Sequence, residues 1–480
     1  MKKNNAIKSI VGVMFSNITT IISGVIVGFL IPKILTVDGY GYYKTFTLYV
    51  SYLGLFSLGI ADGIVLKYGG DDYDQLDRKL FRGYFKWYLL IHCFFALIMA
   101  GIALLFGDEH FTFILVMIAI NMIGLNVTGY YQQLSQITQR FKEYSFRKVL
   151  QSIISILIVL FMFMLYKIQG GSVRYELYVV MIVSMNLILG IWYCFTYKDL
   201  SFGKGLSFGL TRKHLFQLVK DGFPLLVANL CSTLILTIDR QFVSLCYEVS
   251  EYAVYAFAYN LLALITVATS AVSTVMYPMM KRTNEGNLSS YYGNLVSIIS
   301  VFVYGAIIVF YPLQAFIEWY LPKYSDSIPI FRVILPGLVF SSVITVVMHN
   351  YYKVYNLSFM YFVKNLIVLI ISCVLNVAAQ ILFHSMESIS WASIITMVLW
   401  YCYVERTLTG RYGLKCVRNV VYIMLQGLVF YIVTGLFQGI IGAVIYCVEF
   451  VIVSWIFNKK AITDFVRVIK PSNKKEEEAK

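Results

Sequence analysis

The sequence predicts an all-α protein that crosses a membrane about fourteen times. Two observations carry this prediction. Apolar stretches of about 20 residues recur along the whole chain, and the loops that join them alternate between rich and poor in Lys and Arg. A helix needs about 20 mostly apolar residues to cross roughly 30 Å of hydrocarbon. Because several stretches are short or closely joined, twelve or thirteen spans also fit the pattern.

The predicted spans follow one another with short connections. They are 10–32, 45–66, 86–106, 111–133, 149–166, 177–197, 221–244, 253–276, 295–317, 330–350, 362–383, 390–404, 418–437 and 439–457. The first span follows Lys2 and Lys3 as a signal peptide would. Since it is long and has no small-residue cleavage site, we interpret it as an uncleaved anchor.

A weak internal repeat divides the chain near its middle. A shift of 212 residues places Asn17 on Asn229 and Tyr40 on Tyr252, and superposes the first span on the seventh. The expected division is a six-span lobe at 1–197, a cytoplasmic linker at 198–220, a second six-span lobe at 221–410, two further spans at 411–457 and a cytoplasmic tail at 458–480. Two such lobes would be related by a pseudo-two-fold axis along the membrane normal, with a cleft between them.

The distribution of Lys and Arg predicts the orientation. With a cytoplasmic N-terminus, the opposite loops carry little beyond Lys33, Lys44, Lys167, Arg174 and Lys323. The cytoplasmic cations include the group Arg140, Lys142, Arg147 and Lys148. This is the positive-inside pattern, which places both termini in the cytoplasm and the protein in the cell (cytoplasmic) membrane.

Composition excludes several classes of protein. The chain is 59% hydrophobic and 13% charged, with a net charge of +14. The excess charge is shared among cytoplasmic loops, where it meets anionic lipid headgroups, so we expect membrane lipids rather than nucleic acid as partners. The eight cysteines form no CxxC or Cys/His cluster, which indicates packing rather than metal binding. No catalytic motif is present, so we expect neither an enzyme nor a cofactor.

Asp239 and Arg240 are the clearest charged residues inside a predicted span. An ionisable group in hydrocarbon costs about 2.5–3.5 kcal/mol on insertion scales, so it normally faces a cavity or a partner. Adjacent residues on a helix point about 100° apart, so we expect each to need its own partner. For Arg240 this is an anionic ligand in the cleft or, alternatively, the membrane interface.

Four other cations are candidates for substrate binding. Lys33 and Lys44 lie at the outer ends of the first two spans, where snorkelling is the alternative explanation. Lys364 lies near the start of the eleventh span and is a candidate to face the cleft. Arg332, near the outer start of the tenth span, is either a binding residue or interfacial.

Uncharged and acidic residues complete the candidate set. Asn17 and Asn229 occupy equivalent places in the two lobes and would bind substrate or join helices by hydrogen bonds. Asp62 and Glu449 are candidates for coupling transport to H⁺ or Na⁺, although Asp62 could equally be a structural helix cap.

Tyrosines and the tail suggest further roles. Tyr252, Tyr255 and Tyr259 share one face of the eighth span and would stack on sugar rings or pack between helices. In the tail, apolar residues from Ile462 to Ile469 recur with helical spacing among basic ones, which predicts a short helix on the cytoplasmic membrane surface.

Six short motifs carry a family resemblance. They are Pro32–Leu35, Gly39–Tyr43, Leu58–Gly63, Gly222–Leu225, Ile238–Arg240 and Glu251–Tyr255. Their order and spacing resemble the polysaccharide-export flippases of the multidrug/oligosaccharidyl-lipid/polysaccharide (MOP) superfamily. The resemblance implies an undecaprenyl-diphosphate-linked oligosaccharide as substrate, carried by alternating access through a cationic cleft for O-antigen or capsule synthesis. It also implies a polysaccharide polymerase and chain-length machinery as partners.

Three alternatives remain beside this interpretation. A lipid II flippase and a multidrug/toxin exporter belong to the same superfamily, although an exporter of cationic drugs should present carboxylates rather than Arg240 and Lys364. A membrane polysaccharide polymerase or ligase would need a large external loop, and no predicted outer loop exceeds about a dozen residues.

Overall fold

The computed structural model describes residues 3–105, 108–263, 285–355, 357–412 and 417–469. These residues form α-helices with short 3-10 and π segments, and the described ranges contain no strand. The predicted all-α class is therefore confirmed. The chain divides into two compact units, Met1–Ala256 and Phe257–Lys480. The finer division into six-span lobes stays a prediction.

The N-terminal unit contains most of the long helices. They are α1 (Lys3–Ile34), α2 (Val37–Val50), η1 (Leu53–Ser57), α3 (Ile60–Tyr68), η2 (Tyr73–Gln75), α4 (Arg78–Ala103), α5 (Glu109–Ile137), α6 (Phe141–Gln169), α7 (Tyr175–Thr196), α8 (Lys198–Ser201), α9 (Phe208–Ile235) and α10 (Ile238–Cys246). Residues 249–263 form a further helix.

The C-terminal unit is helical in the same way. Its elements are α12 (Glu285–Ile307), α13 (Phe310–Tyr320), η3 (Pro322–Tyr324), α14 (Ser327–Ile334), α15 (Gly337–Ser342), the π segment η4 (Val343–Met348), α16 (His349–Val354), α17 (Ser358–Phe383), α18 (Met386–Tyr412), α19 (Val417–Leu436) and α20 (Gly439–Ile469).

The multi-pass prediction agrees with these helices. Among the described residues, ten helices are long and apolar enough to cross a membrane, and two bent helix pairs raise the number to twelve. Of the other predicted spans, 390–404 lies within the 27-residue α18, and 253–276 begins in the helix over 249–263 and then leaves the described residues. About fourteen spans are thus consistent with the structure.

Glycines allow α3 and α9 to pack backbone against backbone. A Cβ on Gly63 would overlap the Leu218 carbonyl, and one on Gly222 would overlap the Gly59 carbonyl. Gly59 also adopts a left-handed φ of 77°, which favours glycine. The motifs Leu58–Gly63 and Gly222–Leu225 are therefore the two sides of one helix contact.

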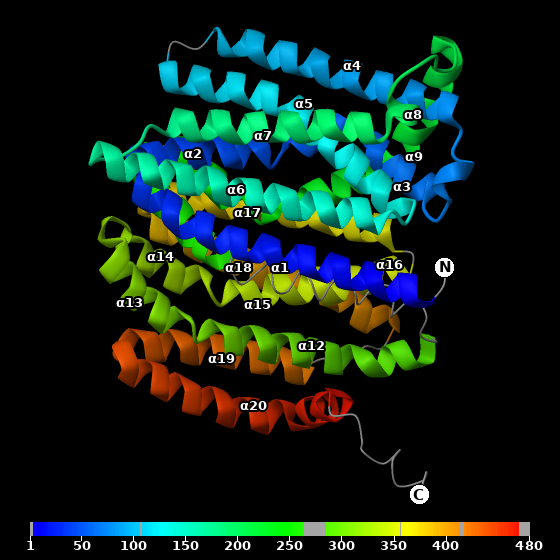
Figure 1. Ribbon diagram of the computed structural model, residues 1–480. Coiled ribbons are helices and arrows are strands. Elements are labelled where there is room, and N and C mark those ends of the chain that lie inside the picture. The colour runs from blue at the N-terminus through cyan, green and yellow to red at the C-terminus, as the bar shows by residue number, and fades with distance from the viewer. Residues whose placement is uncertain (1–2, 106–107, 264–284, 356, 413–416, 470–480) are drawn as a thin grey trace, which may run out of the picture. The chain divides into compact units, whose positions relative to one another are not determined.

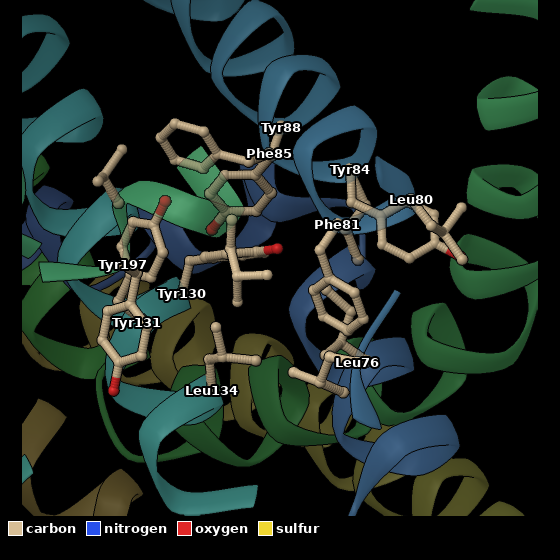
Figure 2. Packing of buried hydrophobic residues seen from close by; sticks show 14 of the residues in the cluster. Leu76, Leu80, Phe81, Tyr84, Phe85, Tyr88, Tyr130, Tyr131, Leu134 and Tyr197 are labelled. Carbon is tan, nitrogen blue, oxygen red and sulfur yellow. The ribbon is translucent and has the colours of Figure 1, made fainter. Parts of the chain in front are cut away.

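Aromatic residues fill the end of the N-terminal unit where α4, α5 and α7 meet the linker (Figure 2). Tyr131 and Tyr197 stack with their ring centroids 5.3 Å apart. Arg82 Nε donates to the Asp199 carbonyl at 2.8 Å, and Lys86 Nζ donates to the Gly203 carbonyl at 2.9 Å. Basic residues at the start of α4 thus hold the predicted linker against the helices that it joins.

The last helix contains a bend. Asn458 has non-helical angles, φ −125° and ψ 16°, near the predicted end of the last span. The chain then continues as a helix to Ile469, so the predicted segment from Ile462 to Ile469 is helical. The side chains from residue 464 onward lie outside the described residues. They include Phe465, Val466 and Ile469, three of the four apolar residues on which the prediction of a surface helix rests.

We expect Gly222→Ala to destabilise the protein, because its Cβ would overlap α3. Overpacking of a close contact typically costs about 1–3 kcal/mol. Gly101→Ala in α4 is the matched control, since a Cβ there has no neighbour within 4 Å. Thermal unfolding in detergent should show a lower Tm for Gly222→Ala and an unchanged or higher Tm for Gly101→Ala. Equal shifts would contradict the backbone contact.

Candidate functional site

The predicted charged residues Asp239 and Arg240 lie at a break between two helices. α9 ends at Ile235 and α10 begins at Ile238, with Thr237 at φ −129° between them. The last carbonyls of a helix lack intrahelical partners and carry partial negative charge. Arg240 Nη2 donates to one of them, Leu236 O, at 2.8 Å. The half-buried guanidinium therefore caps the C-terminal end of α9.

Asp239 stabilises the other side of the same break. Its side chain is 2% exposed and lies in the first turn of α10, where a negative charge is favourable. One carboxylate oxygen accepts from the Arg240 backbone N–H at 2.8 Å, and the other accepts from the Tyr255 hydroxyl at 2.9 Å. The side chains of Asp239 and Arg240 thus have separate partners, and that of Arg240 is a backbone carbonyl, which the sequence analysis did not anticipate.

A second cation, Lys44 of α2, lies near Arg240. Its ammonium is 5.2 Å from the centre of the Tyr40 ring and 5.5 Å from that of Tyr43. The helix that carries Lys44, α2, contacts α10, which carries Arg240, so the two cations lie on neighbouring helices. We call Lys44, Asp239 and Arg240 the Lys44–Arg240 site.

Polar contacts hold the helices of this site together. The Gln241 amide donates to the Tyr49 hydroxyl at 3.1 Å, and Tyr52 and Thr237 share a hydrogen bond of 3.1 Å. The Tyr252 hydroxyl donates to the Lys44 carbonyl at 3.4 Å. Tyr252 and Tyr255 are thus buried between helices, in agreement with the packing interpretation of these tyrosines.

A glycine sets how closely α2 approaches the helix over 249–263. A Cβ on Gly41 would overlap the Val249 carbonyl and side chain. The motifs Gly39–Tyr43 and Glu251–Tyr255 therefore flank one contact, and this contact brings Lys44 to the break that carries Arg240.

The remaining predicted residues of the N-terminal unit lie on α1, α3 and α9. Lys33 is in the last turn of α1, where a cation is favourable at a helix C-terminus. Asn17 of α1 accepts a hydrogen bond from Lys148 Nζ of α6 at 2.7 Å, so it joins two helices. Asn229 is exposed on α9. Asp62 occupies the first turn of α3, where a negative charge is favourable.

The predicted residues of the C-terminal unit join neighbouring helices. Lys364 is 8% exposed and donates to the Tyr403 carbonyl of α18 at 2.9 Å. Arg332 of α14 donates to Thr434 Oγ1 at 3.0 Å and to a second oxygen of α19 at 3.1 Å. Glu449 of α20 accepts from Gln426 at 2.8 Å. Each therefore makes an interhelical contact.

Sequence reasoning missed Lys148, which we had grouped with the cytoplasmic loop cations. The structure places it eight residues into α6, where it points toward α1 through its bond to Asn17. The sequence does contain a pattern that places Lys148 on a helix. One helix face, with i, i+3, i+4, i+7 spacing, carries the polar residues Lys148, Gln151, Ser152 and Ser155. In an otherwise apolar helix, such a stripe indicates a polar environment within the membrane.

Comparisons with known proteins agree with this architecture. A family model described as "Polysaccharide biosynthesis protein" matches residues 6–284. No curated protein sequence matches the chain.

Several solved structures share the fold at low sequence identity. A structure of the lipid II flippase MurJ in an inward closed conformation has a TM-score of 0.71 and 13% identity, covering 96% of this chain and all of that one (100%). An inward-facing multidrug resistance MATE transporter of the MOP superfamily has a TM-score of 0.55 and 14% identity, covering 82% and 95%. A MOP transporter from Pyrococcus furiosus has a TM-score of 0.55 and 13% identity, covering 84% and 96%.

We expect Tyr255→Phe to weaken the helix break, because it removes a hydrogen bond to the buried Asp239 carboxylate. Hydrogen bonds to charged groups contribute about 1.5–3 kcal/mol. Thermal unfolding should show a lower Tm, whereas Tyr291→Phe, at a side chain 51% exposed, should leave it unchanged. In an Asp239→Asn background the effect of Tyr255→Phe should shrink. An undiminished effect there would show that Tyr255 acts through packing alone.

Proposed function

Because the chain belongs to the polysaccharide biosynthesis protein family, we propose that it is a flippase for lipid-linked oligosaccharides. Its substrate would be a repeat unit on undecaprenyl diphosphate, moved across the cytoplasmic membrane by alternating access for surface polysaccharide synthesis. The shared fold supports this proposal, since the similar solved structures are of a flippase and of transporters rather than of enzymes.

The Lys44–Arg240 site is the observation that carries the proposal. A diphosphate that enters the membrane loses its hydration, which costs several kcal/mol or more unless cations replace the water. Lys44 lies in a bent helix pair that is apolar enough to cross the membrane, and Arg240 follows directly after the candidate span Gly209–Ile235, so the two residues supply positive charges at membrane segments. The guanidinium can bind two phosphate oxygens at once, and the Lys44 ammonium adds a point charge.

Asp239 offsets only part of this positive charge, because the site holds two cations and one carboxylate. Its two carboxylate oxygens are occupied by the Arg240 backbone N–H and the Tyr255 hydroxyl, and the side chain is buried. The accessible part of the site is therefore cationic. This favours an anionic lipid-linked substrate over the cationic drugs that a multidrug exporter carries.

A lipid II flippase is the second candidate, because it would also carry a diphosphate-linked lipid. The TM-score of 0.71 to the MurJ structure supports this alternative at the level of the fold. The family model, which is described by polysaccharide biosynthesis, favours the repeat-unit substrate.

The proposal also includes the ion that drives transport and the proteins that act after it. Asp62 and Glu449 are the carboxylates that we propose for coupling to H⁺ or Na⁺. Both termini would lie in the cytoplasm, and a polysaccharide polymerase with its chain-length machinery would take over the translocated units.

Export of surface polysaccharide should depend on the charge and shape of Arg240. Arg240→Lys should keep partial export because it retains a point charge, while Arg240→Ala and Arg240→Glu should reduce export at least about tenfold, the effect of 1.4 kcal/mol. Surface polysaccharide is measured in a strain that has this protein as its sole flippase, with protein levels checked by immunoblot.

Arg174→Glu is the matched control for these variants. Arg174 has a side chain 82% exposed in the loop before α7, so its charge reversal should leave export unchanged. Normal export by an Arg240→Glu protein at ordinary levels would show that Arg240 only caps α9, and the proposed site would be rejected.

A further inference from the structure

A cavity with several polar lining residues lies within the N-terminal unit and adjoins the Lys44–Arg240 site through Tyr43, whose ring centre is 5.5 Å from the Lys44 ammonium. It has a volume of about 340 Å³ and is lined by α1, α2, α6 and α7. In Figure 1, α1 and α6 run side by side, and they supply most of the lining. The polar lining residues of these two helices are Thr20, Ser23, Lys148, Gln151, Ser152 and Ser155.

The cavity extends along the membrane-spanning part of α6. Its lining on α6 runs from Lys148 to Ile158, eleven residues that extend over about 15 Å at the helical rise. α1 and α6 are both apolar enough to cross the membrane. Polar groups at such depth are expensive and usually mark a path or site for a polar solute.

The cavity is positively charged. Among the described residues that line it, Lys148 is the one that carries a charge, and no carboxylate is among them. The Lys148 ammonium has three N–H donors, of which one bonds Asn17 at 2.7 Å. No ion pair formed by the described residues includes Lys148. The remaining donors and the charge therefore favour an oxyanion.

The hydroxyl groups present acceptors rather than donors to the cavity. Thr20 donates its proton to the Ser16 carbonyl at 2.9 Å, Ser152 to the Lys148 carbonyl at 3.0 Å and Ser155 to the Gln151 carbonyl at 2.9 Å. Thr20 Oγ1 and Ser152 Oγ also share a hydrogen bond of 3.2 Å. A hydroxyl has one proton and two lone pairs, so lone pairs remain on these oxygens to accept from a ligand. A ligand with O–H donors therefore fits these oxygens.

Two aromatic rings contribute to the lining of the cavity. Tyr43 and Tyr178 contribute to the lining, and their ring centroids lie 5.0 Å apart in an edge-on arrangement. Rings of this kind offer apolar faces to the C–H surface of a sugar. The lysine, the hydroxyl oxygens and the tyrosine rings together suit a sugar that carries one negatively charged group.

We propose that this cavity binds one acidic sugar unit of the transported glycan, with its oxyanion on Lys148 and its hydroxyls on Thr20, Ser152 and Ser155. The inference rests on the proposed function. The oxyanion would come either from the carboxylate of a uronic acid or from a phosphate attached to the sugar.

Binding of monosaccharides to the purified full-length protein tests this site. The probes are D-glucuronate, D-glucose 1-phosphate and D-glucose, titrated in detergent and followed by thermal shift. At least one of the two acidic sugars should bind about tenfold more tightly than glucose. Lys148→Gln should abolish that preference, whereas Lys142→Gln, at an exposed residue near the start of the same helix, should retain it. The tighter acidic sugar identifies the source of the oxyanion.

A second variant covers the case in which Lys148→Gln does not fold. Ser155→Ala removes one acceptor and leaves the charge, so it should weaken glucose and acidic sugars by the same factor. Equal affinity of the wild type for glucose and both acidic sugars would overturn the proposal. So would an unchanged preference in Lys148→Gln, or binding of phosphatidylglycerol micelles with no binding of any sugar.

The binding assay separates this inference from the proposed flippase activity. It measures affinity without translocation, so loss of acid preference in Lys148→Gln would stand even if Arg240→Glu exported normally. If the wild-type protein supports export but does not bind acidic sugars more tightly than glucose, the proposed function stands and the proposed acidic-sugar site is rejected.

Discussion

Charge desolvation inside the membrane is the constraint on which the candidate sites depend. A charged side chain that leaves water must recover several kcal/mol from its neighbours, and carbonyl oxygens of helices supply much of that compensation here. Lys364 donates to the Tyr403 carbonyl, Arg332 to carbonyl and hydroxyl oxygens of α19, and Arg240 to the Leu236 carbonyl. Lys364 and Arg332 each join two neighbouring helices, whereas Arg240 stabilises the break between α9 and α10.

That interruption links stability to the proposed function. A continuous helix would satisfy every backbone carbonyl and leave no anchor for the guanidinium. The break at Leu236–Thr237 frees carbonyls that Arg240 caps, while Asp239 binds the start of α10. Both residues are thereby fixed beside Lys44, so the cationic character of the site follows from the break. A ligand diphosphate would meet positive charges that the fold already holds in place, which reduces the cost of ordering them on binding.

The glycine motifs have a physical explanation in the same unit. Gly59, Gly63 and Gly222 let α3 and α9 touch backbone to backbone, and Gly41 does the same for α2 and Val249. Close approach of backbones is the usual way to gain packing energy between membrane helices, where water does not drive association. These contacts position α2 and the segment carrying Arg240, so motifs that look degenerate in sequence serve one arrangement.

The sequence by itself determined the fold class and the presence of unusual charges. Hydropathy is a local property, so about 20 consecutive apolar residues predict a membrane span. Asp239 and Arg240 are recognisable in the sequence because charged residues are unusual within such a span. Only the tertiary structure decided their surroundings. Lys44 comes from a helix far away along the chain and Tyr255 from the next helix, and both reach these residues through helix packing. Lys148 is the clearest example of a residue whose surroundings the sequence pattern does not predict. Counted by sequence it belonged to a basic loop, but α6 begins earlier than the apolar stretch and carries it to Asn17, 131 residues away. Hydrogen bonds and charge interactions depend on distance in space, which hydropathy and spacing along one segment do not contain.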